Sequence, residues 1–392
     1  MAKGVGPVET RLFTFGSQKP FVCENGEEIG PVTLAYEIYG KLNQARDNAI
    51  LLFHALTGSH HAAGVNPDYQ GAGDRWTDEI HTGWWDAFIG PKRSLNTDRF
   101  AVICVNWLGH CYGSTGPPSI DPATGRPYGS TFPRITVGDT VRAHFRLLDH
   151  LGIERLHAVV GGSVGGMMCL DVATRFPRRV RFVVPIAAGL KSTTLQKLHN
   201  FEQINAIYKD PDFKGGDYYA GPPPNAGLSL ARMIGHKTFR SLDHMQELAQ
   251  EKVLVSNELV RLPIESYMWH QGEKFVKRFD ANAYLRTMWA WQDFDLYRQA
   301  DRQGMTVRGL LAEGSHKYLA EGAHKYLVFS IDSDVCYYPV EQRELTEELK
   351  GAGLDVDWIT VHSEKGHDAF LLEPHLFEPH LRYHLEAEWF RR

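Results

Sequence analysis

The stretch that decides the fold is residues 156–176, LHAVVGGSVGGMMCLDVATRF. Its apolar start, 156–160, predicts a buried strand, and a segment of helical period follows at 167–176. Between the two, glycines flank Ser163 in the pattern G-x-S-x-G. A strand-to-helix turn this tight tolerates only glycine at the flanking positions, and it exposes the serine hydroxyl at a helix N-terminus, where negative charge is favoured. We therefore interpret Ser163 as a nucleophile rather than an incidental serine of a glycine-rich turn.

Strand and helix signals alternate around this turn. Short β-branched runs bounded by turn residues predict buried parallel strands at 49–55, 100–106, 156–161, 180–187 and 326–331, and a further strand is expected at 355–362. Amphipathic segments at 140–151 and 165–176 lie between some of them, so we expect an α/β fold with a doubly wound sheet. From 191 to 303 the strand signals give way to polar helical stretches. This predicts a helical cap, 191–303, inserted into a core formed by 1–190 and 304–392.

A serine nucleophile needs a base, and the base needs an acid that orients it. In a strand–serine–helix arrangement of this kind the partners follow in the order Ser, Asp, His. His367, in the sequence GHDAF after the strand at 355–362, is therefore the candidate base. Asp332 and Asp334 both follow the strand at 326–331, and they point to the same face if that strand persists. Only loop geometry can choose between them, and we favour Asp334.

Two backbone N–H groups are needed to stabilise the oxyanion of a tetrahedral intermediate. The residue after the nucleophile, Val164, supplies one of them. The other comes from a loop after an early strand, which makes Leu56, in the sequence HALTG of 54–58, the second candidate. The alternative interpretation of 54–58 is a plain strand-to-helix loop.

Composition excludes several classes of function. The formal net charge is −5 and no basic run is present, so we expect no nucleic-acid partner. No apolar stretch reaches membrane-spanning length, and the start, MAKGVGP, lacks a leader pattern, so we expect no membrane association and a cytoplasmic location. The five cysteines are scattered without C-x-x-C pairing, which indicates reduced thiols rather than disulfides or a zinc site.

Two further features are assigned no function. The histidines near the early loop, His54, His60 and His61, lack the additional ligand that a zinc site needs, so we expect no metal. A tandem octapeptide, 312–319 followed by 320–327, is too short for a repeat architecture and is interpreted as a local duplication.

Motifs spread over most of the chain resemble those of the homoserine O-acetyltransferase family, whose members have the α/β-hydrolase fold. The matching segments, taken in order, are HALTG at 54–58, NWLGHCYGSTG at 106–116, GGSVGGM at 161–167, LARMIG at 230–235, QGEKFVKRFDAN at 271–282, DSD at 332–334 and GHDAF at 366–370. Each is short, but the ordered set is specific. The segments 106–116 and 278–282 are not shared by esterases or lipases at large.

The resemblance implies a ping-pong reaction without a cofactor. Acetyl-CoA, as co-substrate, acylates Ser163, and the hydroxyl of L-homoserine, deprotonated by His367, then attacks the acyl-enzyme. The resemblance also assigns Arg232 to the carboxylate of L-homoserine and Asp368 to its amino group. These pairings suit the chemistry of guanidinium and carboxylate groups. Without the resemblance, Arg232 would be interpreted as a solvated helix residue and Asp368 as a turn residue. Members of the family are commonly dimeric, which implies a homodimer.

The sequence departs from the family pattern at several positions. Phe239 stands where relatives have tyrosine, Ser59 replaces an aspartate, Val164 replaces a methionine, and 335–339 is one residue longer than usual. Relatives that use succinyl-CoA carry an arginine just after the triad aspartate. Here no Lys or Arg lies between Asp334 and Arg343, which implies an acetyl donor. The alternatives are a homoserine or serine O-succinyltransferase, or an esterase in which water discharges the acyl-enzyme.

Overall fold

Eight strands form the central sheet of the computed structural model, which describes residues 4–249, 254–256, 259–316 and 324–390. Their spatial order is β1 (Arg11–Phe15), β4 (Val32–Tyr39), β8 (Ala101–Val105), β5 (Ala49–Phe53), β11 (Leu156–Gly162), β12 (Val180–Ile186), β15 (Lys325–Ile331) and β16 (Asp355–Val361). The first two run antiparallel to their neighbours, and the strands from β8 to β16 pair in parallel. The predicted mostly parallel α/β fold is confirmed, and the parallel strands bring their carboxyl ends to one edge.

The predicted strands and helices are present with small shifts at their ends. The strand predicted at 49–55 ends at Phe53, and the strand predicted at 326–331 begins one residue earlier, at Lys325. Helix α1 (Val137–His150) begins earlier than the predicted 140 because Thr136 and Asp139 form a reciprocal capping box. Helix α2 (Val164–Arg175) begins directly after the predicted nucleophile.

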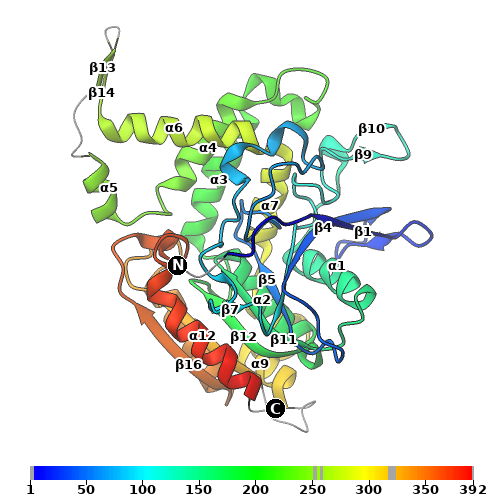
Figure 1. Cartoon of the computed structure of the whole chain (residues 1–392). Helices are drawn as coiled ribbons and strands as arrows, with labels where there is room; N and C mark the ends of the chain where they lie inside the picture. The colour runs from blue at the N-terminus through cyan, green and yellow to red at the C-terminus, as the bar shows by residue number, and fades with distance from the viewer. Residues whose placement is uncertain (1–3, 250–253, 257–258, 317–323, 391–392) are drawn as a thin grey trace.

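Hydrophobic side chains cover both faces of the sheet. Along β5, Leu51 and Phe53 belong to one buried cluster and Ile50 and Leu52 to the other, as the period of two in a strand requires. Helices α1, α2, α9 (Val307–His316) and α10 (Pro339–Gly351) contribute to the first cluster, and α12 (Pro374–Phe390) contributes to the second. In Figure 1 helices α1 and α12 accordingly lie on opposite sides of the sheet.

Helices fill the segment 191–303, which we call the cap segment. They are α3 (Thr194–Tyr208), α4 (Asn225–His236), α5 (Leu242–Ala249), α6 (Pro263–Arg278), α7 (Ala281–Asp293) and α8 (Leu296–Arg302). The extensive packing of α4 against both α3 and α6 makes these helices one layer, visible at the top of Figure 1. A short hairpin, β13 (Leu254–Ser256) with β14 (Leu259–Arg261), lies between α5 and α6.

The remaining strands and α-helix are short. They are the pairs β2 (Phe21–Val22) with β3 (Glu28–Ile29), β6 (Ile89–Gly90) with β7 (Leu95–Asn96) and β9 (Ile120–Asp121) with β10 (Arg126–Pro127), and the helix α11 (Ala369–Leu372). Short 3-10 helices lie at Gly73–Arg75, Asp78–Ile80, Gly129–Thr131, Pro177–Arg179, Pro211–Gly216 and Gly366–Asp368. The tandem octapeptide at 312–327 falls largely on 317–323, outside the described residues.

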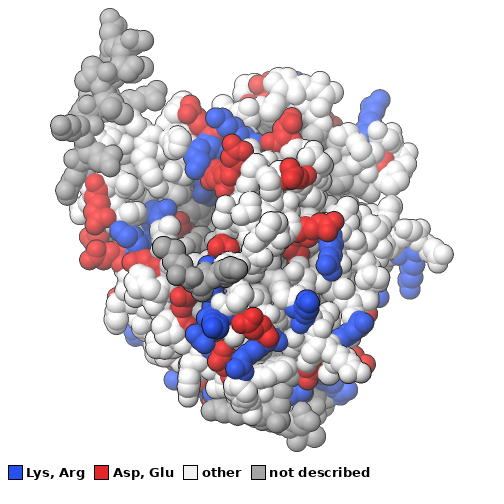
Figure 2. All heavy atoms as spheres, in the orientation of Figure 1, with Lys and Arg blue, Asp and Glu red and all other residues white. Residues whose placement is uncertain are grey.

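The surface and the cysteines are ordinary for a globular enzyme. Figure 2 shows acidic and basic side chains intermixed on the visible face. Of the helices that the structure describes, none is both long and apolar enough to cross a lipid bilayer. The five cysteines are all free and buried.

Candidate active site

Ser163 occupies a strained turn between β11 and α2, with φ 60° and ψ −129°. A non-glycine residue keeps such a conformation only where its surroundings impose it. Here the close approach of neighbouring backbone imposes it. A Cβ atom on Gly161 would lie 2.4 Å from the Gly165 carbonyl oxygen, and a Cβ atom on Gly165 would lie 2.6 Å from the Phe53 carbonyl oxygen. The Ser163 N–H donates to the Ile186 carbonyl at 2.9 Å, which anchors the turn to β12. The glycines of the motif are therefore required by packing.

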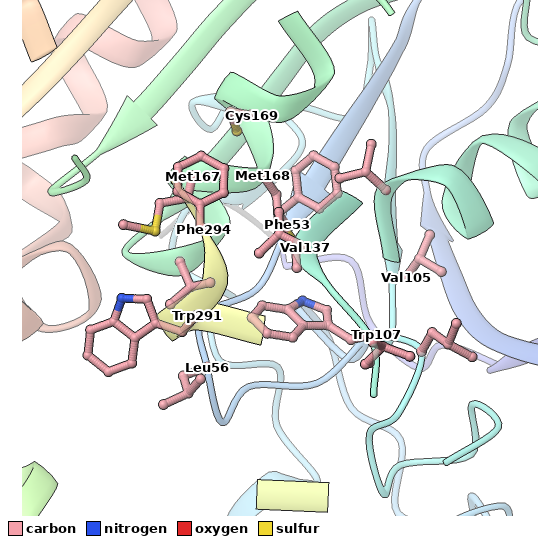
Figure 3. Packing of buried hydrophobic residues seen from close by; sticks show 14 of the residues in the cluster. Phe53, Leu56, Val105, Trp107, Val137, Met167, Met168, Cys169, Trp291 and Phe294 are labelled. Carbon is pink, nitrogen blue, oxygen red and sulfur yellow. The ribbon is translucent and has the colours of Figure 1, made fainter. Parts of the chain in front are cut away.

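The two predicted oxyanion donors lie at this same edge of the sheet, one at the start of a helix and one in a loop. Val164 is the first residue of α2, so its N–H is not used within the helix and lies at the positive end of the helix dipole. Leu56 follows β5, is 6% exposed, and lines a small cavity together with Trp291 and Phe239. Figure 3 shows Leu56 and Trp291 near one another, with Met167 of α2 close by.

His367 and Asp334 are brought together from two loops. The His367 Nδ1 atom lies 2.7 Å from Asp334 Oδ2, and the two residues are 3% and 1% exposed. The other carboxylate oxygen, Oδ1, accepts the backbone N–H groups of Cys336 and Tyr337, each at 2.8 Å. The carboxylate is thus fixed on both sides. His367 Nε2 is buried and has no hydrogen-bond partner among the described residues, which leaves it available for a reacting proton.

Asp332, the alternative acid, points elsewhere. Its Oδ2 lies 2.7 Å from Nδ1 of the exposed His362, and its Oδ1 accepts the Ser363 N–H at 3.1 Å. The strand β15 ends at Ile331, so the two aspartates lie on a loop and do not share a face. The loop geometry that the sequence could not supply therefore pairs His367 with Asp334.

The electrostatics of His367 favour its protonated form. Burial lowers the pKa of His367, but the charge and hydrogen bond of Asp334, with smaller contributions from Asp368 and Glu341, outweigh burial and raise that pKa above 6.5. An imidazole with a raised pKa is a stronger base once deprotonated, as proton abstraction from a hydroxyl requires.

Several residues that support the pair were not predicted. Gln342, fully buried in α10, donates to the Tyr337 carbonyl at 2.6 Å and to Asp334 Oδ2 at 3.4 Å, and accepts the Ile331 N–H at 3.1 Å. The Tyr337 ring stacks on that of His367 with centroids 5.4 Å apart. Gln196, on α3, donates to the Cys336 carbonyl at 2.8 Å and so ties the cap segment to this loop. No motif marked these residues, because their partners come from other parts of the chain.

Arg232 lies on α4 as a partly buried cation that forms no ion pair with another described residue. Its guanidinium carbon is 5.2 Å from the ring centroid of Phe239 and 5.0 Å from that of Phe275, within the range of cation–π contacts. Burial, with the nearby positive charge of Arg278, lowers the pKa of Arg232. Among the described residues no carboxylate lies within ion-pair distance of this guanidinium, although charges that are largely withdrawn from water are ordinarily paired. The site is therefore suited to an anionic ligand.

Asp368 follows His367 in the short turn Gly366–Asp368 and is already paired. Its Oδ2 lies 3.5 Å from Nε of Arg240, a residue of the cap segment that the sequence interpretation missed. Burial raises the pKa of Asp368, and Arg240 is the strongest of the charges that oppose this rise. The structure therefore brings both predicted substrate-binding residues to the neighbourhood of His367, with a second arginine between the cap segment and the core.

The histidines of the early loop are core residues. His61 Nδ1 lies 2.9 Å from Glu37 Oε2, and burial lowers the pKa of His60 to about 4. His54 stacks on Trp107, and burial lowers its pKa well below 6.5. Among the residues that the structure describes, no group of three or more His, Cys, Asp or Glu side chains is arranged to hold a metal ion.

Comparison with known proteins identifies the family. Residues 48–345 match the model of the family described as alpha/beta hydrolase fold. A protein named homoserine O-acetyltransferase, from Solidesulfovibrio magneticus, is 44% identical over 375 residues, which are 94% of this chain and 90% of the relative. The chain belongs to the homoserine O-acetyltransferase family. The family membership predicted from the ordered motifs is therefore confirmed, as is the α/β-hydrolase fold.

Solved structures include both homoserine O-acetyltransferases and hydrolases. The homoserine O-acetyltransferase from Bacillus anthracis matches with a TM-score of 0.82 at 26% identity, over 96% of this chain and 97% of that one. Esterase E22 matches with a TM-score of 0.83 at 28% identity, over 97% of this chain and 100% of that one. The fold alone therefore does not distinguish an enzyme that transfers an acyl group to an amino acid from one that transfers it to water. The side chains of the site must be used to distinguish them.

Proposed function

We propose that this chain transfers the acetyl group of acetyl-CoA to the hydroxyl of L-homoserine, yielding O-acetyl-L-homoserine, a methionine precursor. The observation that carries the proposal is the partly buried guanidinium of Arg232, which has no carboxylate partner among the described residues. It lies over the ring of Phe239, whose centroid is 6.4 Å from that of His367. An esterase that admits water has no need of an unpaired cation for an acceptor carboxylate. The names of the relatives support the same reaction.

In the first half-reaction, His367 Nε2 takes the proton of the Ser163 hydroxyl while the serine oxygen attacks the thioester carbonyl. The amides of Leu56 and Val164 donate to the oxyanion, and the helix N-terminus at Val164 adds a favourable dipole. The C–S bond then breaks, and the protonated His367 returns the proton to the departing CoA thiolate. Asp334 holds Nδ1 protonated throughout, which keeps Nε2 free to act.

In the second half-reaction, L-homoserine takes the place of CoA. Its carboxylate binds Arg232 and its ammonium binds Asp368, so its hydroxyl is presented to His367. His367 removes the hydroxyl proton, the oxygen attacks the acetyl carbonyl, and the bond to Ser163 breaks as the serine oxygen regains a proton from His367. No cofactor or metal takes part in these steps. Residues 191–303 act in this scheme as a cap over the core of 1–190 and 304–392.

The lining of the cavity supports an acetyl donor. Beside Leu56, Trp291 and Phe239, it is lined by Gln196, His199, Asn200, Gln203, Gly235, Thr238 and Cys336, none of which is Lys or Arg. A succinyl group would bring a carboxylate that needs a cation. An acetyl group has no such requirement, so it is compatible with a lining without Lys or Arg beside the oxyanion loop.

The competing function is hydrolysis, which the match to esterase E22 favours. Thiol release from acetyl-CoA, measured with and without L-homoserine, separates the two. The proposal predicts a slow release that L-homoserine accelerates strongly and that L-serine accelerates less. Release at one rate with or without the amino acids would instead identify a hydrolase, and a preference for L-serine would reassign the acceptor.

We also propose a homodimer in the cytoplasm. Helix α3 exposes Leu195, Leu198, Phe201 and Tyr208, at 41%, 55%, 62% and 47%, an apolar surface that association would bury. The five free cysteines support a reducing compartment. Light scattering on a sizing column tests the dimer: the wild-type protein should elute as a dimer and Phe201→Glu as a monomer, whereas a wild-type monomer would overturn this part of the proposal.

A further inference from the structure

The linker between α4 and α5, residues 237–241, is packed against the turn that carries His367. The Asp368 N–H donates to the Phe239 carbonyl at 3.0 Å, and the Ser241 hydroxyl donates to the Glu364 carbonyl. Gly366 has φ 72°, and a Cβ atom there would lie 2.4 Å from the Ser241 nitrogen. The backbone on both sides of Arg240 is therefore fixed relative to the catalytic turn.

Arg240 reaches from this linker to the carboxylate of Asp368. The two side chains are 15% and 18% exposed, and the Arg240 Nε atom, 3.5 Å from Asp368 Oδ2, is buried without a hydrogen-bond partner. No described residue donates a hydrogen bond to the other oxygen, Oδ1. The carboxylate is thus held on one side by the cap segment and open on the other, directly beside His367.

We propose that Arg240 is a positioning residue for the acceptor, which holds the Asp368 carboxylate from the cap segment so that its free oxygen can receive the ammonium group of an amino acid. The inference rests on the proposed function and deepens it, because it assigns a residue that acts only in the second half-reaction. Arg240 acts through Asp368 and touches neither the acyl group nor His367.

Charge provides a second reason for the role. The ionisable groups that act on Asp368 are Arg240 from the linker, His367 from its own turn, Arg232 from α4 and Asp334 from the loop after β15. Burial raises the pKa of Asp368, as does Asp334, and Arg240 is the strongest opposing charge. Without Arg240 the pKa of Asp368 rises further, so the carboxyl group becomes protonated at a higher pH. A protonated carboxyl group cannot pair with an ammonium.

The test uses the two half-reactions of the full-length enzyme. In ping-pong kinetics, kcat/KM for each substrate reports only the half-reaction that this substrate enters. Arg240→Met should lower kcat/KM for L-homoserine by about tenfold or more, the size expected for the loss of one charge-assisted contact. It should leave kcat/KM for acetyl-CoA within about twofold. Arg240→Lys, which keeps the charge, should recover part of the loss, and Lys237→Met, an exposed neighbour, should behave as wild type.

The pH dependence separates positioning from a structural role. The ratio of kcat/KM for L-homoserine in Arg240→Met to that in the wild type should fall as the pH is lowered, because the variant's Asp368 is protonated at a higher pH than that of the wild type. Equal losses in both half-reactions, or a ratio independent of pH, would overturn the inference. The inference would also be overturned if Arg240→Met lowered kcat/KM for L-homoserine by the same factor in an Asp368→Asn background as in the wild type. This comparison holds even if the variants are less stable. Failure of wild-type transfer to L-homoserine would instead refute the proposed function.

Discussion

Replacing each of the two aspartates after β15 by asparagine tests the assignment of the triad acid. In Asp334→Asn the amide oxygen can keep the backbone N–H groups of Cys336 and Tyr337, which are 2.8 Å from Oδ1. The amide nitrogen then faces His367 Nδ1, 2.7 Å away, so two donors oppose each other and the imidazole shifts its proton to Nε2. A histidine protonated at Nε2 cannot take the proton of Ser163, and turnover should fall by about ten-thousand-fold.

Asp332→Asn serves as the matched control. Asp332 has a 41% exposed side chain and pairs with the exposed His362, so the same change of charge two residues away should reduce turnover by no more than about threefold. The assay is steady-state thiol release from acetyl-CoA with saturating L-homoserine, with thermal melting to verify that both variants are folded. The reverse ranking, or equal losses for folded variants, would refute the assignment of Asp334 as the acid.

The remaining predictions concern the nucleophile, the donor, the base and the loop that carries the acid. Ser163→Ala should lose transfer by on the order of a million-fold, because no other group can hold the acyl unit; substantial residual transfer would remove covalent catalysis from the mechanism. Acetyl-CoA should be preferred over succinyl-CoA by at least about tenfold in kcat/KM at fixed L-homoserine, a difference of roughly 1.4 kcal/mol; equal rates would mean that a cation reaches the acyl group. The raised pKa of His367 keeps the base protonated, and therefore inactive, up to a pH above 6.5, so kcat/KM for acetyl-CoA should rise with pH through an inflection above that value; an inflection below it would contradict the influence of Asp334. Gln342→Leu leaves the Ile331 N–H without its buried partner and should lower the free energy of unfolding by about 1–3 kcal/mol in urea titrations; an unchanged value would show that the loop does not depend on it.

Much of the fold could be predicted because the parallel strands β5, β8, β11, β12 and β15 are short, largely buried and uninterrupted. The antiparallel strands β1 and β4 were missed, and β4 carries Glu37, a charged residue buried at 1% exposure. This carboxylate is tolerated because Tyr39 of the same strand bonds to it, together with His61 and Asn66, which lie outside the strand. The early start of α1 had a visible signal in Thr136 and Asp139, the spacing of a capping box.

At the site, local sequence was informative only where backbone geometry imposes residue types. The turn at Ser163 requires glycines, so the sequence displays it. The choice between Asp332 and Asp334 depends on how the chain leaves β15, and the sequence left it open. Arg240 and Gln342 act through contacts between distant segments, the first with Asp368 and the second around Asp334. Such contacts leave no pattern in a single sequence.

The central claim, covalent transfer through Ser163 to an amino-acid hydroxyl, is tested most directly by mass spectrometry of the intact enzyme. The mass of the undigested protein is measured after mixing with acetyl-CoA alone and again after a chase with L-homoserine, and digestion of each sample then locates the acetyl group. The account predicts one acetyl group located on Ser163, which persists without an acceptor and disappears on the chase as O-acetyl-L-homoserine forms. An unmodified Ser163, or an acetyl group lost to water as fast as to L-homoserine, would contradict it.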